Sequence, residues 1–408
     1  MRDLLMKREA KDFDIATDAL AEQTEEIFKN TRPIGKQFGV ILVIHNKIPF
    51  EVATFRVDEG YSDGRRPDKV VFGTAQMDAL RRDFTINGLL YDPIKDEIID
   101  YIDGAADIKK KVIKAIGDPS RRFEEDKLRM LRAVRFASTL GFTIEKETLK
   151  AISKKASQVS VVSSERIRDE LVKMMTGPYA YEGLKILDET GLLKIILPSV
   201  EDLKTIKQPP QFHPTPNAFE HTRLLFKYLK DPTPRVAMAA LLHDIGKAKT
   251  MTKTDRIRFN NHDNVGASMA KDILKGLRFP NDDIKLIVRY IKNHMKFIEV
   301  TKMRESTLKK FLGQENFKEE IELHKADCLA SHKNIENYDF CNNKLKTLSR
   351  NDLKPDSKIK GKDLISLGFV PGPKFKKILD FAYNEQLEDK KTTKLALLQL
   401  IKIKYPLK

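Results

Sequence analysis

The segment KDFDIAT (residues 11–17), together with the apolar, β-branched runs VILVIHN (40–46) and FEVATFR (50–56), decides how the first part of the chain folds. Only a short turn around residues 47–49 separates the two runs, and this spacing predicts an antiparallel β-hairpin. Two further strands are expected at KVVFG (69–73) and EIIDYID (97–103). The N-terminal part is therefore predicted to contain a small mixed β-sheet.

Acidic side chains gather in this β-rich region. Asp12 and Asp14 are two residues apart, so both leave the same face of the sheet if the segment is extended. Neighbouring carboxylates repel each other unless a cation lies between them, and Mg²⁺ prefers oxygen ligands. Glu51 lies at the start of the run FEVATFR and is expected beside them. Three carboxylates holding two Mg²⁺ ions form a site at which a 3′-hydroxyl can attack an α-phosphate, although solvated strand acids are the simpler alternative.

Beyond residue 107 the pattern becomes helical. Apolar residues recur at spacings of three and four in DKLRMLRAVRFASTLGF (126–142) and PRVAMAALLHDIGKA (234–248). Candidate linkers are the proline-containing segments 207–220 and 350–363. The sequence therefore predicts an α+β protein, in which a head with a small mixed β-sheet precedes an all-helical remainder.

Composition narrows the class of partner. Lys and Arg number 75 against 59 Asp and Glu, a net charge of +16, and such an excess favours polyanions because neutralised phosphates release counterions. No run of about 18 apolar residues occurs, so no membrane span is expected, and the first residues lack the apolar core of a signal peptide. Cys328 and Cys341 suggest neither a disulfide framework nor a zinc ribbon. We therefore expect a cytoplasmic protein.

The order of several motifs carries a resemblance. Four segments, taken in order, resemble the head of class II tRNA nucleotidyltransferases and bacterial poly(A) polymerases. They are RDLLMKREAKDFDIATDA (2–19), FEVATFR (50–56), EGYSDGRRPDKVVFG (59–73) and LRRDFTINGLLYDP (80–93). The resemblance runs over almost the whole chain. It implies that Asp12 and Asp14 hold the two Mg²⁺ ions and that Glu51 is the third catalytic acid.

The nucleotide is expected to contact two of these segments. The resemblance implies that Arg82, Asp83 and Asn87 handle the sugar and phosphates, with Asp83 at the 2′-hydroxyl, whereas a charged helix N-terminus is the ordinary alternative. Arg2 and Asp3 match the end of the family's V-R-D, but the preceding glycine pair is missing. Such glycines let backbone amides approach a triphosphate. We expect a start codon further upstream or a truncation, and disorder of Arg2 and Asp3 without the preceding strand.

The segment GDPSRRFEEDKLRMLRAVRFA (117–137) predicts a turn followed by a helix. On that helix Asp126 and Arg129 share a face and can present an acceptor and donors to the edge of a base. The alternative is an ordinary ion pair between Glu125 and Arg129. E-D-x-x-R resembles the family's amino-acid template, which selects CTP and ATP. Arg132 and Arg135 continue the basic stripe and are expected to meet phosphates.

A second constellation follows in the body. The order of four residues resembles the metal ligands of HD-domain phosphohydrolases: His221, His243, Asp244 and Asp327. His262 and His294 are candidate further ligands or phosphate contacts. Imidazole with carboxylate suits Mn²⁺, Ni²⁺ or Co²⁺, with Mg²⁺ as another candidate. Such a site would hydrolyse phosphomonoesters or 2′,3′-cyclic phosphates, although some family members keep the domain only as a scaffold.

Near the C-terminus, GFVPGPK (368–374) predicts a turn between two helices. Such turns can aim backbone N–H groups at phosphate, with charge added by Lys374, Lys376 and Lys377. A plain helix connection with solvated lysines is the alternative. The segment resembles the tail with which bacterial tRNA nucleotidyltransferases grip the tRNA elbow.

Together these features predict an enzyme that adds CCA to tRNA from CTP and ATP. The alternatives are a poly(A) polymerase or A-adding relative, because RPIGKQFGVILV (32–43) partly resembles a poly(A) polymerase signature with Gln37 in place of a basic residue, and an HD phosphohydrolase or RNA-binding scaffold with an inactive head. Oligomeric state stays open. The expected division is a nucleotidyltransferase catalytic head (1–107), a helical neck with the nucleotide-selecting motif (108–175), a helical body containing the HD domain (176–345) and a helical tRNA-binding tail (346–408).

Overall fold

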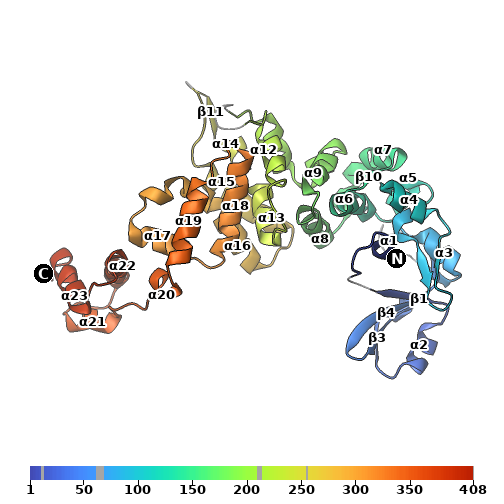
Figure 1. Cartoon of the computed structure of the whole chain (residues 1–408), viewed down its shortest axis with the longest axis horizontal. Helices are drawn as coiled ribbons and strands as arrows, with labels where there is room; N and C mark the ends of the chain where they lie inside the picture. The colour runs from blue at the N-terminus through green and yellow to red at the C-terminus, as the bar shows by residue number, and fades with distance from the viewer. Residues whose placement is uncertain (11–12, 61–68, 209–213, 254–255, 408) are drawn as a thin grey trace. The chain divides into compact units, whose positions relative to one another are not determined.

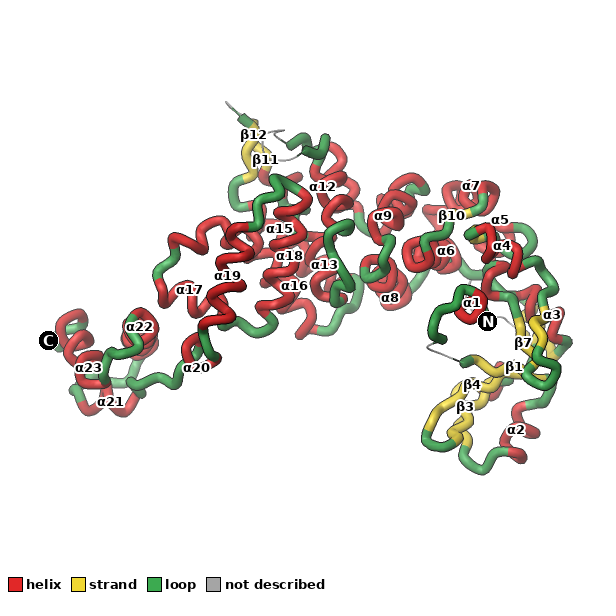
Figure 2. Tube along the Cα trace, in the orientation of Figure 1, coloured by secondary structure: helices red, strands yellow, loops and turns green. Residues whose placement is uncertain are grey.

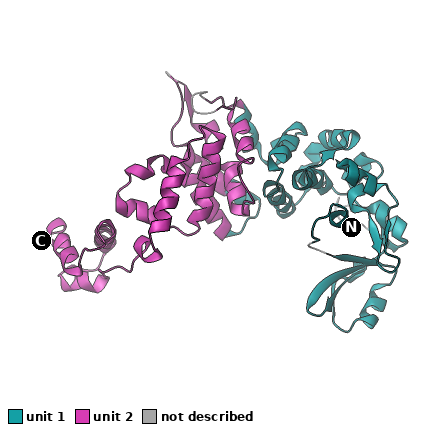
Figure 3. Cartoon of the chain, viewed as in Figure 1, with its two compact units in different colours: residues 1–204, 272–281 teal, residues 205–271, 282–408 magenta. Residues whose placement is uncertain are grey.

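The structure, a computed structural model, describes residues 1–10, 13–60, 69–208, 214–253 and 256–407. Asp12 of the predicted metal site therefore lies outside the described residues. The chain forms two compact units, residues 1–204 with 272–281 and residues 205–271 with 282–408 (Figure 3). The four-part division expected from the sequence is finer than this and stays a prediction.

A four-stranded sheet opens unit 1, in the order β1-β4-β3-β2 (Figure 1). Its strands are β1 (Asp14–Thr17), β2 (Thr31–Gly35), β3 (Val40–His45) and β4 (Ile48–Thr54). β1 runs parallel to β4, and the other neighbours are antiparallel. Because side chains alternate along a strand, Ile41, Val43 and Val52 share one face and pack with Ala21 of α2 (Ala21–Ile27). This small core fixes the register of the strands that carry the predicted acids.

The predicted hairpin is confirmed, but its turn is tighter than the expected residues 47–49. Asn46 and Lys47 alone form it, with φ values of 51° and 66°, and His45 pairs directly with Ile48. Two consecutive left-handed residues match the right-handed twist of the strands, and Asn tolerates that conformation well. Pro49 accordingly belongs to β4 instead of the turn.

Two smaller hairpins complete the head. β5 (Arg56–Glu59) pairs with β6 (Lys69–Phe72), and β7 (Leu90–Asp92) pairs with β8 (Glu97–Ile99). The strand expected at 69–73 is thus confirmed, whereas the one expected at 97–103 ends at Ile99. Asp100 ends it, since its carboxylate accepts hydrogen bonds from the N–H groups of Gly104 (3.0 Å) and Ala105 (2.9 Å) at the start of the next helix.

Helices form most of the remainder of unit 1 (Figure 2). They are α1 (Arg2–Leu5), α3 (Ala75–Arg81), α4 (Gly104–Lys110), α5 (Pro119–Glu125), α6 (Leu128–Leu140), α7 (Lys146–Lys155), α8 (Ser164–Met175), α9 (Ala180–Glu189), α10 (Leu192–Ile196) and α11 (Pro198–Glu201), with short 3₁₀ turns that include η2 (Thr85–Asn87). The centre of this part is α6, which packs against α8 and α9. Its apolar side chains, from Leu128 to Leu140, are largely buried as their spacing predicted.

The expectation of helices alone after residue 107 is wrong in two places. β9 (Val112–Ile113) pairs in parallel with β10 (Thr143–Ile144), where left-handed Lys111 and Gly141 end α4 and α6. In unit 2, β11 (Met251–Lys253) and β12 (Ile257–Phe259) form a second pair. Both pairs are too short for their β-branched residues to give a strand pattern that stands out among helices.

Unit 2 is built almost entirely of helices. Their bounds are α12 (Ala218–Leu225), α13 (Pro234–Leu242), α14 (Lys247–Thr250), α15 (His262–Gly276), α16 (Asn281–Asn293), the 3₁₀ segment η5 (His294–Lys302), α17 (Glu305–Leu312), α18 (Phe317–Ala330), α19 (Glu336–Thr347), α20 (Arg350–Leu353), α21 (Gly361–Ser366), α22 (Pro373–Glu388) and α23 (Lys394–Lys404). Residues 272–281, which comprise the end of α15 and the turn after it, group with unit 1.

Separate apolar clusters support the end of this unit. One surrounds Phe297 and Phe311, and another joins α21, α22 and α23 through Leu364, Ile378 and Leu397. The predicted α+β class, with sheets in the head and a helical body, is confirmed. Among the described residues no helix has both the length and the apolarity that a membrane span requires.

Candidate nucleotide and metal sites

The acids of the head lie on adjacent parallel strands. Asp14 is the first residue of β1, and its register partner on β4 is Glu51. Register partners in a sheet direct their side chains to the same face, and both residues are exposed. Two oxygen donors on one open face fit a hard divalent cation, and Asp12, the other predicted acid, lies outside the described residues.

Four predicted nucleotide residues form one chain of hydrogen bonds. Arg2 Nη1 donates to Asn87 Oδ1 (2.8 Å), and Asn87 Nδ2 donates to Asp83 Oδ1 (3.0 Å). Arg132 reaches Asp83 Oδ2 from the other side, through Nε (2.7 Å) and Nη2 (2.6 Å). Asp3 pairs with Arg2 at 3.0 Å. The expected disorder of Arg2 and Asp3 is therefore wrong, because α1 supplies their backbone and Asn87 gives Arg2 a partner.

Asp83 is the buried centre of this chain. Burial alone would raise the pKa of its carboxyl, but Arg132 and the hydrogen bonds from Asn87 and the Phe84 N–H hold that pKa below its usual value. The carboxylate therefore stays ionised and acts only as an acceptor. A ribose hydroxyl that donates to it would meet a fixed, charged partner.

Basic side chains gather beside Asp83. Arg82 donates to the main-chain oxygen of Asn87 (3.0 Å) and pairs with Asp78 (3.0 Å). The guanidinium carbons of three arginines lie near the Phe136 ring centroid, at 5.1, 5.5 and 3.7 Å for Arg2, Arg132 and Arg135. Cations over an aromatic face are stabilised by its quadrupole. The sequence indicated the arginines but not Phe136, because a buried Phe on an amphipathic helix is ordinarily core.

The predicted face shared by Asp126 and Arg129 does not exist. The helix breaks at Asp126, which is extended (φ −144°, ψ 108°) between α5 and α6. Arg129 instead pairs with Glu125 at 2.7 Å. Asp126 pairs with Arg166 of α8 at 2.6 Å. No glycine or proline marks the break, so the local sequence does not indicate it.

Arg135, the last residue of the basic stripe, is also paired. Its Nε donates to Glu170 Oε2 of α8 at 2.7 Å, and Arg132 lies 4.0 Å from the same carboxylate. Sequence reasoning missed Arg166 and Glu170, whose partners lie 40 and 35 positions earlier. Arg166 and Glu170 lie one turn apart on the same face of α8. This spacing is the local sequence feature that could have pointed to them.

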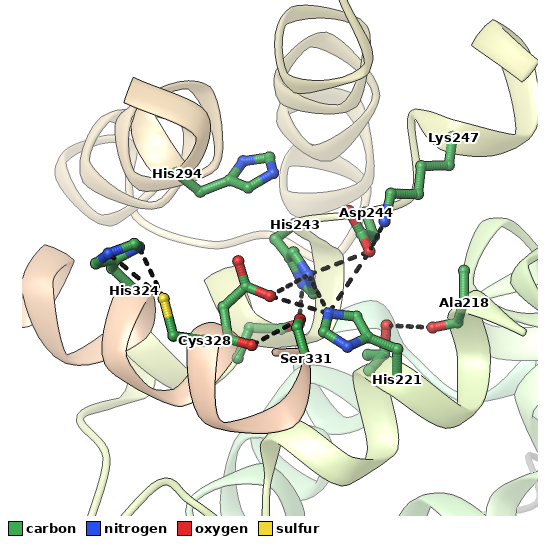
Figure 4. A network of polar contacts seen from close by, with 12 residues as sticks. Ala218, His221, His243, Asp244, Lys247, His294, His324, Cys328 and Ser331 are labelled. Atoms are coloured by element: carbon green, nitrogen blue, oxygen red, sulfur yellow. Dashed lines mark hydrogen bonds and ion pairs between the residues drawn. The ribbon is translucent and has the colours of Figure 1, made fainter. Parts of the chain in front are cut away.

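Helices of unit 2 bring the predicted HD residues together (Figure 4). His221 lies on α12, His243 and Asp244 follow α13, and Asp327 lies on α18. His221 Nε2 is 3.0 Å from Asp327 Oδ1 and 3.8 Å from Asp244 Oδ2, and His243 Nε2 is 3.3 Å from the same Asp244 oxygen. All except Asp327 are almost fully buried. Buried imidazoles and carboxylates at these distances suit a transition metal or Mn²⁺.

Two groups of three residues in this cluster could each hold a metal ion. The first triad is His221, His243 and Asp244, and the second is Asp244, His262 and His294. His262 begins α15 and His294 begins η5, and their Nε2 atoms lie 3.2 Å apart. His262 Nε2 is 3.6 Å from Asp244 Oδ1, whereas His221 and His243 lie near the other oxygen, Oδ2. Within each triad, one donor atom per residue lies within 4.8 Å of the others. The two oxygens of Asp244 therefore face two candidate metal positions.

Electrostatics favours the ligand forms of Asp244 and His294, whereas the neighbouring carboxylates of Asp244 and Asp327 raise the pKa of His243. Burial would raise the pKa of Asp244, but His243 and Lys247 hold it well below its usual range. Burial, with His243 and His262 nearby, lowers the pKa of His294 to about 4, so its imidazole is neutral and can bind a cation. Lys247 Nζ donates to Asp244 Oδ2 (2.7 Å) and Gln208 Oε1 (2.8 Å). Lys247 was not predicted, although it stands three residues after Asp244.

In the tail the predicted turn between two helices is present between α21 and α22. Lys374, Lys376 and Lys377 lie in the first turns of α22, and all three are exposed. Phe375 and Ile378, between and after them, pack into the tail cluster. The lysines are thus fixed on the outer side of α22 near its N-terminus, which favours anions.

Comparisons with known proteins agree with this arrangement. Family models match at residues 1–114 (poly A polymerase head domain), 141–204 (probable RNA and SrmB-binding site of polymerase A) and 218–331 (HD domain). A CCA-adding enzyme of Bacillus pumilus is 44% identical over 202 residues, 49% of this chain and 50% of that protein. One of Lactobacillus johnsonii is 46% identical over 193 residues, 47% and 48% of the two chains. The chain thus spans about half the length of the curated relatives it matches.

Solved structures extend the similarity of fold to nearly the full length. The CCA-adding enzyme of Bacillus stearothermophilus in complex with CTP has a TM-score of 0.75 at 24% identity, covering 99% of this chain and 92% of that one. The Thermotoga maritima CCA-adding enzyme complexed with tRNA has a TM-score of 0.61 at 18% identity, covering 99% and 89%. The three matched regions thus follow one another along the chain as head domain, RNA-binding site and HD domain, the order expected from the resemblance in sequence.

Proposed function

We propose that the protein is a cytoplasmic enzyme that adds CCA to tRNA 3′ ends from CTP and ATP, without a nucleic-acid template. The observation that carries this proposal is the register of Asp14 opposite Glu51 on one open face of the head sheet. That face supplies oxygen ligands where a nucleotidyltransferase needs them, and the curated relatives with this head are CCA-adding enzymes.

In the head, Asp12, Asp14 and Glu51 would hold two Mg²⁺ ions. Bound there, the ions would lower the pKa of the tRNA 3′-hydroxyl and offset charge on the α-phosphate and the departing pyrophosphate. Asp14 and Glu51 are exposed on the sheet face, so their oxygens remain open for this role.

Around the nucleotide, the chain of Arg2, Asn87, Asp83 and Arg132 would hold sugar and phosphates. Asp83, ionised and buried, would accept the 2′-hydroxyl and so favour ribonucleotides. Arg82, Arg132 and Arg135 concentrate positive charge beside it for the triphosphate. Each is held by an acidic partner, so little side-chain entropy remains to be lost when phosphate binds.

Base choice would rest on Asp126 and Arg129. Cytosine and adenine each carry an exocyclic amine where uracil and guanine carry a carbonyl oxygen. A carboxylate can accept from the amine but repels the oxygen, whereas a guanidinium donates to the neighbouring ring nitrogen. This pattern selects CTP and ATP together. Because Asp126 lies between the two helices and pairs with Arg166, whereas Arg129 pairs with Glu125, the two groups are held by different partners.

The sharpest test supplies tRNA transcripts that end before the first C, the second C and the A, each with one labelled nucleotide. Two C additions from CTP alone, followed by a single A that requires ATP, are expected. Incorporation of ATP alone, or many A residues on any RNA, would instead assign the A-adding or poly(A) alternative. The lysine-bearing tail and the tRNA complex of a related fold favour tRNA as substrate.

A second function is favoured by the buried cluster in unit 2. We infer that this HD domain is a metal-dependent phosphohydrolase that acts on phosphomonoester or 2′,3′-cyclic phosphate ends of RNA. His221, His243, Asp244 and Asp327 would hold one ion, and His262 with His294 a second, bridged by Asp244. Mn²⁺, Ni²⁺, Co²⁺ and Mg²⁺ are the candidates, and a bound ion would supply an activated water. Lys247 would offset phosphate charge.

A further inference from the structure

The break between α5 and α6 gives Asp126 a fixed backbone. Its φ and ψ, −144° and 108°, place it outside both helices, and its Oδ1 accepts a hydrogen bond from the Leu128 N–H at 3.0 Å. The carboxylate therefore stands at the start of α6, where the helix dipole favours a negative group. With this hydrogen bond alone, only one oxygen of the Asp126 carboxylate would be held in place.

Arg166 holds both oxygens of the Asp126 carboxylate. Its Nη1 donates to Asp126 Oδ1 (3.2 Å) and its Nη2 donates to Asp126 Oδ2 (2.6 Å). Two parallel bonds from a planar guanidinium fix the plane of a carboxylate as well as its position. Both side chains are mostly buried, with exposed fractions of 22% and 16%, so water competes weakly for these bonds.

The helix that carries Arg166 is itself well anchored. α8 packs against α6, and its Glu170, one turn after Arg166, pairs with Arg135 of α6. Residues four apart on a helix lie on one face, so a single face of α8 holds both Asp126 and Arg135. Arg129 is held separately, by Glu125 of α5 at 2.7 Å. Asp126 and Arg129, the two proposed base-reading residues, are therefore held by different partners.

The acceptor positions of Asp126 show what this support leaves open. An ionised carboxylate offers about four acceptor positions. On Asp126 the Leu128 N–H and the Arg166 Nη1 take the positions on Oδ1, and Arg166 Nη2 takes one on Oδ2. A single acceptor position therefore remains, on Oδ2.

We propose that Arg166 determines base specificity by fixing Asp126 so that it presents one acceptor, and no donor, to the incoming base. Held in this way, Asp126 accepts from the exocyclic amine of cytosine or adenine and cannot rotate to relieve its repulsion of the oxygen of uracil or guanine. Arg166 acts through Asp126 and is a positioning residue. This inference rests on the proposed nucleotide addition and names the residue behind its selectivity.

The test compares kcat/KM for CTP, UTP, ATP and GTP in the parent, Arg166→Ala, Arg166→Lys and Lys173→Ala. Lys173 is an exposed cation on the same helix and serves as the matched control. Arg166→Ala is expected to lower the CTP/UTP and ATP/GTP ratios by about tenfold or more, within what one bidentate contact contributes to discrimination. Arg166→Lys keeps the positive charge but cannot donate two parallel hydrogen bonds, so its CTP/UTP and ATP/GTP ratios should lie between those of Arg166→Ala and the parent. The ratios of Lys173→Ala should match those of the parent.

Each outcome decides one point. If Arg166→Ala lowers kcat/KM equally for all four nucleotides, Arg166 only supports the fold and the inference is overturned; if the Ala variant does not fold, the same comparison is made with the Lys variant. If the parent adds no nucleotide to tRNA, the proposed function fails instead. A parent that is selective for CTP and ATP, with ratios unchanged in both Arg166 variants, overturns the inference alone.

Discussion

Asp14 and Glu51 face each other across the parallel pair of β1 and β4, as register partners on one side of the head sheet. Adjacent strands lie about 4.8 Å apart, so two exposed carboxylates stand close enough to repel each other when no cation is bound. A divalent ion relieves this repulsion and binds both. The pair is therefore expected to matter more for catalysis than for folding.

Replacing Asp14 tests this relationship directly. Asp14→Asn and Asp14→Ala should each lower nucleotide transfer at least about a hundredfold, a loss of roughly 2.7 kcal/mol of transition-state stabilisation. The melting temperature and tRNA affinity should stay near those of the parent, because the residue is exposed. The measurement is single-turnover incorporation of CTP into tRNA. Glu26→Gln, an exposed acid on α2, is the control; activity above a few per cent in an Asp14 variant would falsify the metal-site assignment.

Arg129 and Arg132 should respond differently to truncation. Arg129→Ala removes the proposed base donor and should lower discrimination against UTP and GTP by about 1–3 kcal/mol. Arg132→Ala leaves Asp83 without its charged partner and should slow all nucleotides alike. Steady-state kcat/KM for each nucleotide separates the two patterns. Unchanged rejection of UTP and GTP by Arg129→Ala contradicts the template assignment.

The HD cluster can be tested without disturbing the head. Asp244→Asn should abolish metal-dependent release of phosphate from 2′,3′-cyclic ends and lower bound Mn²⁺ at both positions, because Asp244 belongs to both triads. His262→Ala with His294→Ala should lose only the second ion. Metal content by elemental analysis checks both, and nucleotide addition should persist. His332→Ala, an exposed histidine in the same unit, is the control. A parent that releases no phosphate from these ends with Mn²⁺, Ni²⁺, Co²⁺ or Mg²⁺ contradicts the phosphohydrolase proposal.

The lysines at the start of α22 predict a salt-dependent effect on RNA. Changing Lys374, Lys376 and Lys377 together to Ala should raise the KM for tRNA about tenfold and leave kcat unchanged, since they lie far in sequence from the head. Each lost phosphate contact should reduce the slope of log K against log salt by about 0.7–0.9. Lys402→Ala, on α23, is the control. An unchanged slope would mean that these lysines only solvate the helix.

The sequence was most informative where the signal is local. The apolar, β-branched runs predicted the β3–β4 hairpin, and the position of Glu51 at the start of the second run predicted that it would neighbour Asp14. The order of His221, His243 and Asp244 likewise predicted a cluster that the helices of unit 2 assemble. The hairpin joins residues that are close in sequence, whereas the acids and the histidines are brought together by pairing of strands and packing of helices.

Features that depend on tertiary partners could not be predicted. The break at Asp126 lies within a pattern that fits a continuous helix, and only Arg166 and the Leu128 N–H explain why it is stable there. Arg129 forms the ordinary ion pair with Glu125, the alternative that its spacing also allowed. The position of Asp244 in both triads depends on the placement of α15 and η5, which no local spacing encodes.

Asp83 makes a prediction about pH and stability. Its pKa in the folded protein is below the ordinary value of 3.8, since Arg132 and Asn87 outweigh the effect of burial. A lowered pKa adds stability that is fully present above the unfolded pKa and is lost as pH falls through the folded one. Asp83→Asn should therefore cost about 1.5–3 kcal/mol at neutral pH, the contribution of hydrogen bonds to a charged group, and this cost should be constant between about pH 5 and pH 8.

Below about pH 4 the free energies of unfolding of the parent and of Asp83→Asn should become similar. At that pH the Asp83 carboxyl binds a proton when the parent unfolds, so the stabilisation from the ionised group is lost. Urea unfolding of the protein, followed by circular dichroism at several pH values, measures the difference. Asp96→Asn, which changes an exposed carboxylate that accepts a hydrogen bond from Tyr91, is the control. A difference between parent and Asp83→Asn that grows below pH 4 would mean that Asp83 is protonated in the folded protein. It could then donate a hydrogen bond, and its assignment as the fixed acceptor for the 2′-hydroxyl would be wrong.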